Sequence, residues 1–410
     1  MSLPKLLVVC PSVLFPLDMA SKVRILNILK AAKGRFETTF LSTCARQDIP
    51  SNEKALQSIC SQVVILPSRN RKNHAIRFLH RTVCSLLHYS VGLPSELYYS
   101  GILNLSPKRV QDVLDGTLFD IVLFEYWFGS RAVEYFKKVG VPCILDMHDI
   151  LWKKRVTSKM PNENNRALVR KYQDFLDRRY RLFEEAMWNR FDGLISINIA
   201  EEKYVRRKLP SNISIINAGT GVDVSEWPYC WNPEPGRIIF YGSLSSRQNI
   251  LATLRCAKKI MPLVWAKVPN AELWVVGANP PQSILDLQVN PRIKVTGFVD
   301  QPQQVVSTAQ VVVCPLNGEY GFRSRLIEVM ALGVPVVCTT DAVYGMNLDN
   351  GYGILAYDND QAIAEAVTEI LISPDFAKEQ SLAARRQVEE KFSFDATYGR
   401  IVSFLSSYLN

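Results

Sequence analysis

The sequence predicts an α/β fold with two doubly wound domains, each built on a parallel sheet that helices cover on both faces. Short aliphatic and β-branched runs alternate with longer helical stretches, and this alternation occurs twice along the chain. The runs are too apolar to leave one face in water, as expected for buried parallel strands. With 410 residues, of which 48% are hydrophobic, the chain is long enough for each domain to bury its own core.

The predicted strands fall into two series separated by a linker. The first series begins at Lys5, Thr38, Gln62, Asp120, Val141, Gly193 and Ile213, and the second at Arg237, Glu272, Ile293, Val311, Pro335 and Tyr352. Amphipathic stretches between the strands, such as 249–268, predict helices. The apolar periodicity lapses at 222–236, where Trp, Pro, Asn and Gly cluster. We expect an N-terminal domain over 1–225, a C-terminal domain over 226–392, and a last helix over 393–410 that crosses back onto the N-terminal domain.

The composition argues against several classes of protein. The nine cysteines are odd in number, scattered, and never spaced as CxxC, so neither a disulfide framework nor a zinc site is indicated, and a reducing cytoplasm fits best. The first residues lack the hydrophobic region of a signal peptide, and no apolar run reaches the roughly 18 residues of a membrane-spanning helix. We therefore expect a cytoplasmic protein whose membrane contact is at most peripheral, on the inner face.

The positive charge of the chain belongs to its N-terminal half. Up to residue 231 there are 33 Lys and Arg against 22 Asp and Glu, or +11, whereas the remainder has 15 against 17, or −2. The basic, amphipathic segment 69–81 is typical of a helix lying on an anionic bilayer, and the alternative is a solvated helix with a buried apolar stripe. No recognised nucleic-acid module accompanies the charge, so we expect no nucleic-acid partner. His74, His80 and His88 are too irregularly spaced for a metal site.

The segment 317–340 carries the most specific chemical signal. It follows a predicted strand, and parallel sheets bind ligands at the carboxyl ends of their strands. Gly321 permits close approach of the backbone to a ligand, and the helix that follows offers free amides to an anion. Arg323 and Arg325 beside those amides suit a diphosphate, and the Glu328 carboxylate can reach a vicinal diol. The alternative is a capped helix with solvated side chains.

Several segments, taken in order, resemble retaining glycosyltransferase family 4. They are Pro11 to Leu29, LDMHD from Leu145, RIIFYGSLSSRQN from Arg237, VPNAELWVVGA from Val268, VTGFVD from Val295, and the segment from Asn317 to Thr340. The resemblance implies the GT-B fold, with two facing Rossmann-like domains and a cleft between them. It also implies a retaining hexosyltransferase that needs no metal or other cofactor. Such an enzyme moves a sugar from a nucleotide-diphosphate sugar to a polysaccharide, glycan or lipid-linked acceptor.

The resemblance also implies roles for individual residues. The expected donor-binding residues are Gly242, Ser243, Arg247, Gln248, Phe298, Val299, Gly321, Phe322, Arg323, Ser324, Arg325 and Glu328. Glu328 would hold the ribose hydroxyls, and Phe298 and Val299 would meet the base largely through backbone groups. The expected catalytic residues are His148, near the reacting carbon, with Glu319 and Arg247. The acceptor-side loop would contribute Asp18, Ala20, Ser21 and Arg24.

The chain departs from the family pattern at its donor site. Tyr320 stands where the family has its first signature glutamate, with Glu319 one position away. Ser243 and Gln248 occupy positions where the family has an arginine and a lysine, and Arg247 is the nearest replacement. These changes indicate a divergent member. The alternatives are a catalytically silent protein that binds nucleotide sugar or a partner enzyme, and another GT-B activity such as a phosphorylase or an epimerase.

Overall fold

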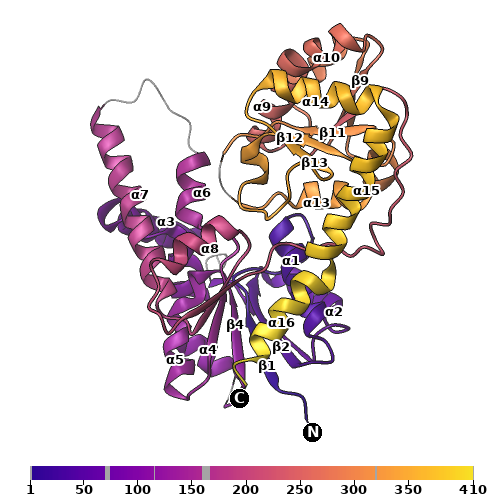
Figure 1. The fold of residues 1–410 in the computed structure, drawn as a ribbon. Helices are drawn as coiled ribbons and strands as arrows, with labels where there is room; N and C mark the ends of the chain where they lie inside the picture. Colours follow the sequence, from indigo (N-terminus) through magenta and orange to yellow (C-terminus); the bar gives the residue numbers. More distant parts are fainter. Residues whose placement is uncertain (1, 70–73, 115, 159–166, 319–320, 410) are drawn as a thin grey trace. The chain divides into compact units, whose positions relative to one another are not determined.

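The computed structural model describes residues 2–69, 74–114, 116–158, 167–318 and 321–409. These residues form two compact units (Figure 1). The N-terminal unit comprises 1–218 and 398–410, and the C-terminal unit comprises 219–397. The chain thus passes between the units at residue 218, a few residues before the linker expected from the sequence, and returns to the N-terminal unit at its end.

The N-terminal unit is built on a seven-stranded sheet in the order β3-β2-β1-β4-β5-β6-β7, and every pair of neighbours is parallel. The strands are β1 (Lys5–Val9), β2 (Glu37–Cys44), β3 (Gln62–Pro67), β4 (Ile121–Glu125), β5 (Cys143–Asp146), β6 (Gly193–Ser196) and β7 (Ser214–Asn217). All residues of β4, β5 and β6 are buried, because helices cover both faces of the sheet. The seven predicted strands are therefore confirmed.

Helices of the N-terminal unit connect these strands. They are α1 (Ala20–Ala32), α2 (Ile49–Leu56), α3 (His74–Val91), α4 (Pro107–Leu114), α5 (Val133–Lys138), α6 (Leu151–Ser158), α7 (Ala167–Trp188), α8 (Ile199–Arg206) and α16 (Arg400–Ser406), with a π-helix η3 (Leu97–Asn104) and 3-10 turns η1 (Arg46–Asp48) and η4 (Trp127–Ala132). Helix α16 packs against α1, and Asn27 Nδ2 donates to Tyr398 Oη at 3.4 Å. Helix α3 extends ten residues beyond the predicted basic segment, whose residues 70–73 lie outside the described part of the chain.

The C-terminal unit contains a six-stranded parallel sheet in the order β10-β9-β8-β11-β12-β13. Its strands are β8 (Arg237–Tyr241), β9 (Glu272–Val276), β10 (Ile293–Gly297), β11 (Val311–Cys314), β12 (Val336–Cys338) and β13 (Ile354–Ala356). All six coincide with predicted strands. The central strands β8 and β11 are adjacent although two strands separate them in sequence, so the strand order reverses between them.

Helices of the C-terminal unit cover both faces of its sheet. They are α9 (Arg247–Arg255), η5 (Cys256–Ile260), α10 (Met261–Lys267), α11 (Gln282–Leu285), η6 (Asp286–Val289), α12 (Pro302–Val306), α13 (Ser324–Ala331), η7 (Thr340–Val343), α14 (Asp360–Ile372) and α15 (Pro374–Lys391), and η8 (Asp395–Gly399) spans the boundary between the units. The predicted helix 249–268 is interrupted by the π-helical segment η5. Pro262 follows this segment and has no N–H to bond the carbonyl four residues earlier, which accounts for the interruption.

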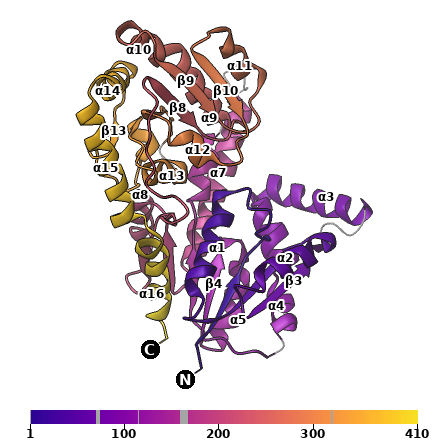
Figure 2. The ribbon, with the colours of Figure 1, turned by 90° about the vertical axis from the view of Figure 1, so that its right-hand side faces the viewer.

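Two further findings bear on the class of protein. All nine cysteines are free, and only Cys230 among them is exposed. In the described residues, no helix combines the length and apolar character needed to cross a bilayer. Figure 2 shows α3 at the outside of the N-terminal unit, where much of its surface is exposed.

Candidate functional site

A cavity of about 210 Å³ opens in the C-terminal unit where β8 and β11 end. Its lining residues are Tyr241, Gly242, Ser246, Gln248, Asn249, Cys314, Leu316, Phe322, Arg323, Ser324, Arg325 and Leu326. The strand order of the sheet reverses between β8 and β11, and a crevice at such a switch point is the usual ligand position in a doubly wound sheet. The topology of the unit thus makes this cavity a candidate binding site.

Two helices point their amino-terminal ends at this cavity. Ser246 precedes α9 and Arg323 precedes α13, and neither side chain caps the helix that it precedes. The first amides of a helix have no partner within the helix and carry partial positive charge. A cavity lined by two such ends is suited to an anion with several oxygens.

Backbone packing explains the glycine after β8. A Cβ atom on Gly242 would lie 3.0 Å from Nδ2 of Asn249, whose amide donates to the Ser243 carbonyl at 2.8 Å. A Cβ on Gly277, which follows β9, would lie only 1.9 Å from the Gly242 carbonyl oxygen. A side chain is therefore excluded at Gly277, and one at Gly242 would crowd the Asn249 side chain, so the turn leaves its backbone open to the cavity.

Arg325, Tyr241 and Glu328 form a charged network beside the cavity. Nη1 of Arg325 donates to Oε2 of Glu328 at 3.0 Å and to the Tyr241 hydroxyl, and the guanidinium lies 5.0 Å from the centre of the Tyr241 ring. Burial raises the pKa of the Glu328 carboxyl, while the Arg325 charge acts in the opposite direction. Burial likewise raises the pKa of Tyr241 to about 12. Arg325 thus holds the Glu328 carboxylate in a fixed position.

The predicted donor residues divide into those that line the cavity and those that do not. Gly242, Gln248, Phe322, Arg323, Ser324 and Arg325 line it. Ser243 and Arg247 are exposed at the start of α9, and Phe298, 75% exposed, follows β10. Gly321 has φ 70°, and Val299 is half-buried against the core. Glu328 does not line the cavity itself but accepts a hydrogen bond from Arg325, which does. Glu319, the predicted catalytic carboxylate, lies outside the described residues.

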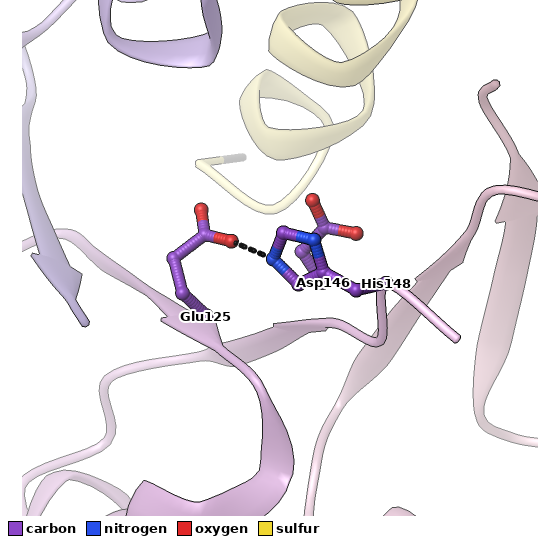
Figure 3. A group of neighbouring side chains, drawn as sticks. All are labelled: Glu125, Asp146 and His148. Carbon is purple, nitrogen blue, oxygen red and sulfur yellow. Dashed lines mark hydrogen bonds and ion pairs between the residues drawn. The ribbon is translucent and has the colours of Figure 1, made fainter. Parts of the chain in front are cut away.

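In the N-terminal unit, His148 belongs to a buried cluster at the ends of β4 and β5 (Figure 3). Glu125 ends β4 and Asp146 ends β5, and the two residues are paired in register. Nε2 of His148 lies 2.7 Å from Oε2 of Glu125. The three side chains are buried, so the sheet holds a histidine between two acidic groups.

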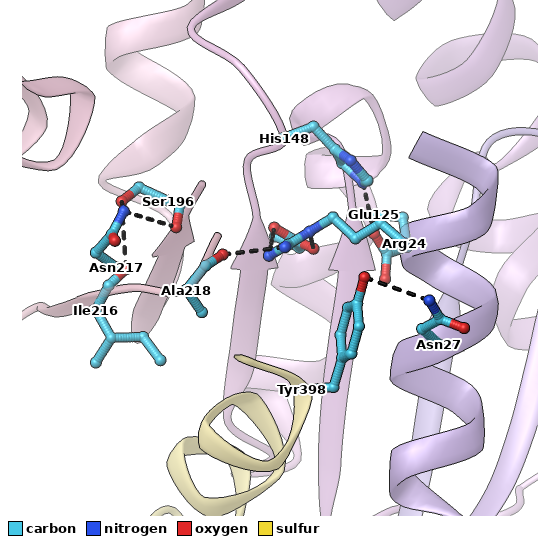
Figure 4. Close-up of polar contacts among 10 residues, drawn as sticks. Arg24, Asn27, Glu125, His148, Ser196, Ile216, Asn217, Ala218 and Tyr398 are labelled. Carbon is cyan, nitrogen blue, oxygen red and sulfur yellow. Dashed lines mark hydrogen bonds and ion pairs between the residues drawn. The ribbon is translucent and has the colours of Figure 1, made fainter. Parts of the chain in front are cut away.

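Arg24 completes this network from helix α1 (Figure 4). Its Nε and Nη2 donate to the two oxygens of Asp146 at 2.8 and 3.2 Å, and its Nη1 donates to the Ala218 carbonyl at 3.0 Å. Burial favours a protonated Asp146, but the Arg24 charge outweighs it and holds the pKa of that carboxyl below its usual range. Because Arg24 already occupies both oxygens of Asp146, the cluster fits a charge network better than a metal site.

Glu125 is less well compensated than Asp146. Burial raises the pKa of its carboxyl against the opposing hydrogen bond from His148. Its Oε1 atom has no hydrogen-bond partner in the described residues. The His148 imidazole thus faces a carboxyl group whose charged form gains little stabilisation from its other neighbours.

Aromatic stacking and backbone conformation fix the His148 ring. Tyr126 stacks on it with ring centres 4.0 Å apart and planes 15° apart. Both residues have positive φ, 65° for Tyr126 and 60° for His148, and the Tyr126 amide donates to the Asp146 carbonyl at 3.0 Å. Such backbone conformations are uncommon outside glycine and tend to occur at functional sites. The local structure therefore holds the histidine in one orientation.

The acceptor-side residues expected on a loop lie mostly on helix α1. Ala20, Ser21 and Arg24 are helical, and the preceding Asp18 is exposed in an ion pair with Lys22 at 2.7 Å. Arg24 is buried, and its guanidinium is bound to Asp146.

Sequence reasoning missed Glu125 and Tyr126. A carboxylate at the end of an otherwise apolar run, here IVLFE, is the signal that could have identified Glu125. Its pairing with His148 depends on the register of β4 with β5, which a single sequence does not reveal.

Comparison with known proteins supports this description of the fold. Residues 235–373 match the family model for glycosyl transferases group 1. A sucrose-phosphate synthase from Thermosynechococcus elongatus superimposes with a TM-score of 0.67 at 15% identity, covering 98% of each chain. A glycosyltransferase from Rickettsia africae gives a TM-score of 0.66 at 13% identity over the full length of both chains. HepE from Anabaena gives 0.62 at 14% identity, covering 98% of this chain and all of HepE.

No curated protein is similar enough in sequence to count as a match. The two parallel-sheet units, their strand orders and these structural likenesses together identify the fold of the chain as GT-B.

Proposed function

We propose that this chain is a glycosyltransferase that takes its sugar from a nucleoside-diphosphate donor bound at the C-terminal cavity. The observation that carries the proposal is the meeting of two helix amino termini and two arginines, Arg323 and Arg325, in one cavity at the switch point of the sheet. The residues that line this cavity all fall within the segment that matches the glycosyl transferase family model.

The charge of the cavity supports binding of a diphosphate. Among its described lining residues there is no carboxylate, whereas Arg323 and Arg325 contribute guanidinium groups that bind phosphate oxygens well. When the bond to the sugar breaks, negative charge develops on the departing diphosphate. Preorganised amides and guanidinium groups stabilise that charge, and removing one such donor typically costs on the order of a hundredfold or more in rate.

We assign the rest of the donor to residues around the cavity. Glu328, oriented by Arg325, would accept hydrogen bonds from the ribose hydroxyls. The backbone at Phe298 and Val299 would meet the base. HepE from Anabaena has been solved with UDP and glucose, so UDP-glucose is the first donor to test.

The reaction that we propose retains the anomeric configuration and needs no metal ion. The acceptor hydroxyl attacks the anomeric carbon on the face that the diphosphate leaves, and its proton passes to a phosphate oxygen. The buried network of His148, Glu125 and Arg24 is our candidate for the catalytic element of the acceptor-binding unit.

The exposed surface of α3 supports a membrane-linked acceptor. Phe78, Leu86 and Tyr89 are each at least 60% exposed, and they line a shallow groove of about 890 Å³ together with Arg77 and Arg81. Apolar side chains beside cations are typical of helices that bind anionic bilayers. We propose that α3 lies on such a surface and gives the enzyme access to a lipid-linked glycan.

Sedimentation with vesicles tests the membrane proposal. The protein should sediment with vesicles of phosphatidylglycerol more than with vesicles of phosphatidylcholine, and Phe78→Asp with Leu86→Asp should abolish the difference. Leu251→Asp, a substitution of an exposed leucine on α9, is the matched control. If the double variant still sedimented with phosphatidylglycerol vesicles as much as the wild type does, α3 would not be the membrane contact.

Turnover with a panel of nucleotide sugars and acceptors tests the main proposal. Release of nucleoside diphosphate that depends on an acceptor supports a glycosyltransferase. Tight binding of a nucleotide sugar without turnover favours the silent binding protein, for which Ser243 and Gln248 are the motivating substitutions. Dependence on inorganic phosphate would instead indicate a phosphorylase, and epimerisation of a free nucleotide sugar would indicate an epimerase.

A further inference from the structure

A second cavity, of about 250 Å³, lies entirely within the N-terminal unit. It opens at the carboxyl ends of β1, β2 and β3, and η3 supplies a further wall. The side chains that the following argument uses are Asp48, Ser68, Tyr99, Ser100 and Asn104. The cavity is smaller than the roughly 300–1,000 Å³ of pockets for drug-sized ligands, so its occupant is limited to about one ring.

Several polar groups of this cavity have no hydrogen-bond partner in the described part of the chain, although Thr43 Oγ1 donates to the Pro11 carbonyl at 3.2 Å. Asn104 is only 5% exposed, and its Oδ1 accepts from the Arg69 amide at 2.9 Å. Its Nδ2, the hydroxyls of Ser68 and Ser100, and the Asp48 carboxylate make no hydrogen bond or ion pair in the described part of the chain. Of these residues only Asn104 is buried, whereas Asp48, Ser68 and Ser100 are partly exposed. Buried side-chain amides are nearly always hydrogen-bonded, so the unpaired Nδ2 of Asn104 favours a polar ligand in the cavity.

The wall that carries Asn104 has an unusual conformation. Residues Leu97–Asn104 form a π-helix, and the Leu105 amide bonds the Ser100 carbonyl five residues earlier at 2.6 Å. Such segments are rare and are frequently found at functional sites. Close packing holds it in place, since a Cβ on Gly101 would lie 2.1 Å from the Phe128 carbonyl oxygen. Side chains at 99, 100 and 104 all reach the cavity from this one turn.

Arg109 fixes the position of Asn104 from behind. Its Nη1 donates to the Asn104 carbonyl at 3.1 Å and its Nη2 to the Pro67 carbonyl at 2.6 Å. The end of β3 and the end of η3 are therefore tied together, and Oδ1 of Asn104 is tied to the chain beyond β3. With Oδ1 accepting from the Arg69 amide, the two N–H donors of the side-chain amide remain for a ligand.

From these features we infer that this cavity binds one neutral sugar ring of the acceptor. A sugar ring presents hydroxyl groups that both donate and accept, and the cavity offers an amide donor at Asn104, an acceptor at Asp48, and hydroxyls that do both. Tyr99 adds an aromatic side chain. The lining contains no Lys, Arg or His, so an anionic group such as a phosphate or a uronate would face Asp48 without compensation.

The position of the cavity in the sheet agrees with this role. It lies at the ends of β1, β2 and β3, whereas Glu125 and His148 lie at the ends of β4 and β5. Neighbouring strands are about 4.8 Å apart, and β1 separates β2 from β4, so the end of β2 lies about 10 Å from the end of β4 along the sheet edge. The assignment of this sugar to the acceptor rests on the proposed transfer function.

The test is saturation-transfer NMR on the full chain without a donor. The probes are methyl α-glucopyranoside, methyl β-galactopyranoside and N-acetylglucosamine at 10 mM, with glucuronic acid as the anionic comparator. Asn104→Asp keeps Oδ1 for the Arg69 amide but removes both N–H donors, so it should weaken neutral-sugar binding about tenfold. Ser100→Ala should weaken it less, and Asn189→Asp, at an exposed position directly after α7, should leave it unchanged.

The inference is overturned if no neutral sugar binds, if glucuronic acid binds better, or if Asn104→Asp and Ser100→Ala both bind sugar as the wild type does. Calorimetry with UDP separates this result from the proposed function. Binding of sugar without binding of UDP or any other nucleoside diphosphate would leave the cavity assignment standing and remove the transferase. Binding of UDP without binding of any sugar would leave the transferase standing and remove the cavity assignment.

Discussion

The two units share one architecture but hold their charges differently. In the described part of the N-terminal unit, the buried Arg, Asp, Glu and His residues are Arg24, Glu125, Asp146, His148, Glu184 and Glu201. In the described part of the C-terminal unit, the buried polar residues are all uncharged. The charged pair at its cavity is nearer to solvent, with the Arg325 side chain 52% exposed and that of Glu328 22% exposed.

This difference indicates what each unit has to do before a ligand binds. Removing an ion from water is costly unless a partner and further hydrogen bonds compensate it. The N-terminal unit compensates this desolvation when it folds, so its network is rigid and already formed before a ligand binds. The C-terminal unit leaves its charges partly hydrated, and a bound diphosphate would complete their desolvation. Substitutions in the first network should therefore change stability, and those in the second should change binding.

The largest effect is expected from Arg24→Met. It leaves Asp146 buried without its guanidinium partner, which typically costs about 3–5 kcal/mol of stability. Differential scanning calorimetry would measure the loss in unfolding of the N-terminal unit. Arg190→Met removes an exposed partner of Glu134 in the same unit and should cost less than about 1 kcal/mol. Equal losses in the two variants would show that the buried network contributes no more than a surface pair.

A pH-dependent effect is expected at Glu184. This carboxyl accepts from the amides of Leu151 and Trp152 at 2.9 and 2.8 Å, and burial raises its pKa to about 8. Between the unfolded value near 4.5 and pH 8, the folded chain keeps a proton that the unfolded chain has lost. Stability therefore falls as pH rises through this window, by up to about 1.4 kcal/mol per pH unit. Glu184→Gln should remove that slope in melting curves from pH 5 to 9.

The neighbouring Glu185 should not contribute to the change of stability over this pH range. Burial acts to raise its pKa, but hydrogen bonds from Tyr204 and Arg181 outweigh it and lower the pKa. Its contribution to stability is therefore fully present above about pH 4.5 and constant from pH 5 to 9. If the difference in melting temperature between wild type and Glu184→Gln stays constant from pH 5 to 9, the assignment of a raised pKa to Glu184 is contradicted.

In the C-terminal unit, Arg325→Ala should weaken binding of UDP about 10- to 100-fold, because one charge-assisted contact to the diphosphate is lost. Stability should change much less than in Arg24→Met, since the side chain is half exposed. Calorimetric titration with UDP measures the first effect. Arg247→Ala, at an exposed position outside the cavity lining, should reduce the affinity for UDP less than Arg325→Ala does. A larger loss of affinity in Arg247→Ala would place the diphosphate closer to α9.

The sheets and the candidate site differ in how far the sequence predicts them. The strands are apolar runs bounded by polar or glycine residues, so local composition identifies them, and all thirteen were predicted. The helix that starts near Arg323 was also predicted, because Gly321 and Pro335 mark its two ends in the sequence. These features depend on neighbours along the chain.

The buried network and the second cavity depend instead on contacts between distant segments. Arg24 meets Asp146 across 122 positions, and Glu125 meets His148 only because β4 and β5 pair in one particular register. The cavity at Asn104 needs a π-helix, and no simple sequence pattern specifies one. Sequence reasoning therefore placed Arg24 on the acceptor-side loop without its partner Asp146, and it did not identify Glu125 or Asn104.

The smallest effect is expected from Phe298→Ala, which tests a third kind of residue, neither buried nor paired. The side chain is 75% exposed, so its removal leaves no hole in the core, and stability should change by less than about 0.5 kcal/mol. If the base is met by the backbone at Phe298 and Val299, the affinity for UDP in calorimetric titration should fall less than about threefold. An aromatic ring stacked on a base typically contributes about 1–3 kcal/mol. A loss of tenfold or more would therefore mean that the ring itself binds the base, and the C-terminal unit would then recognise its donor through a side chain that folding leaves in water.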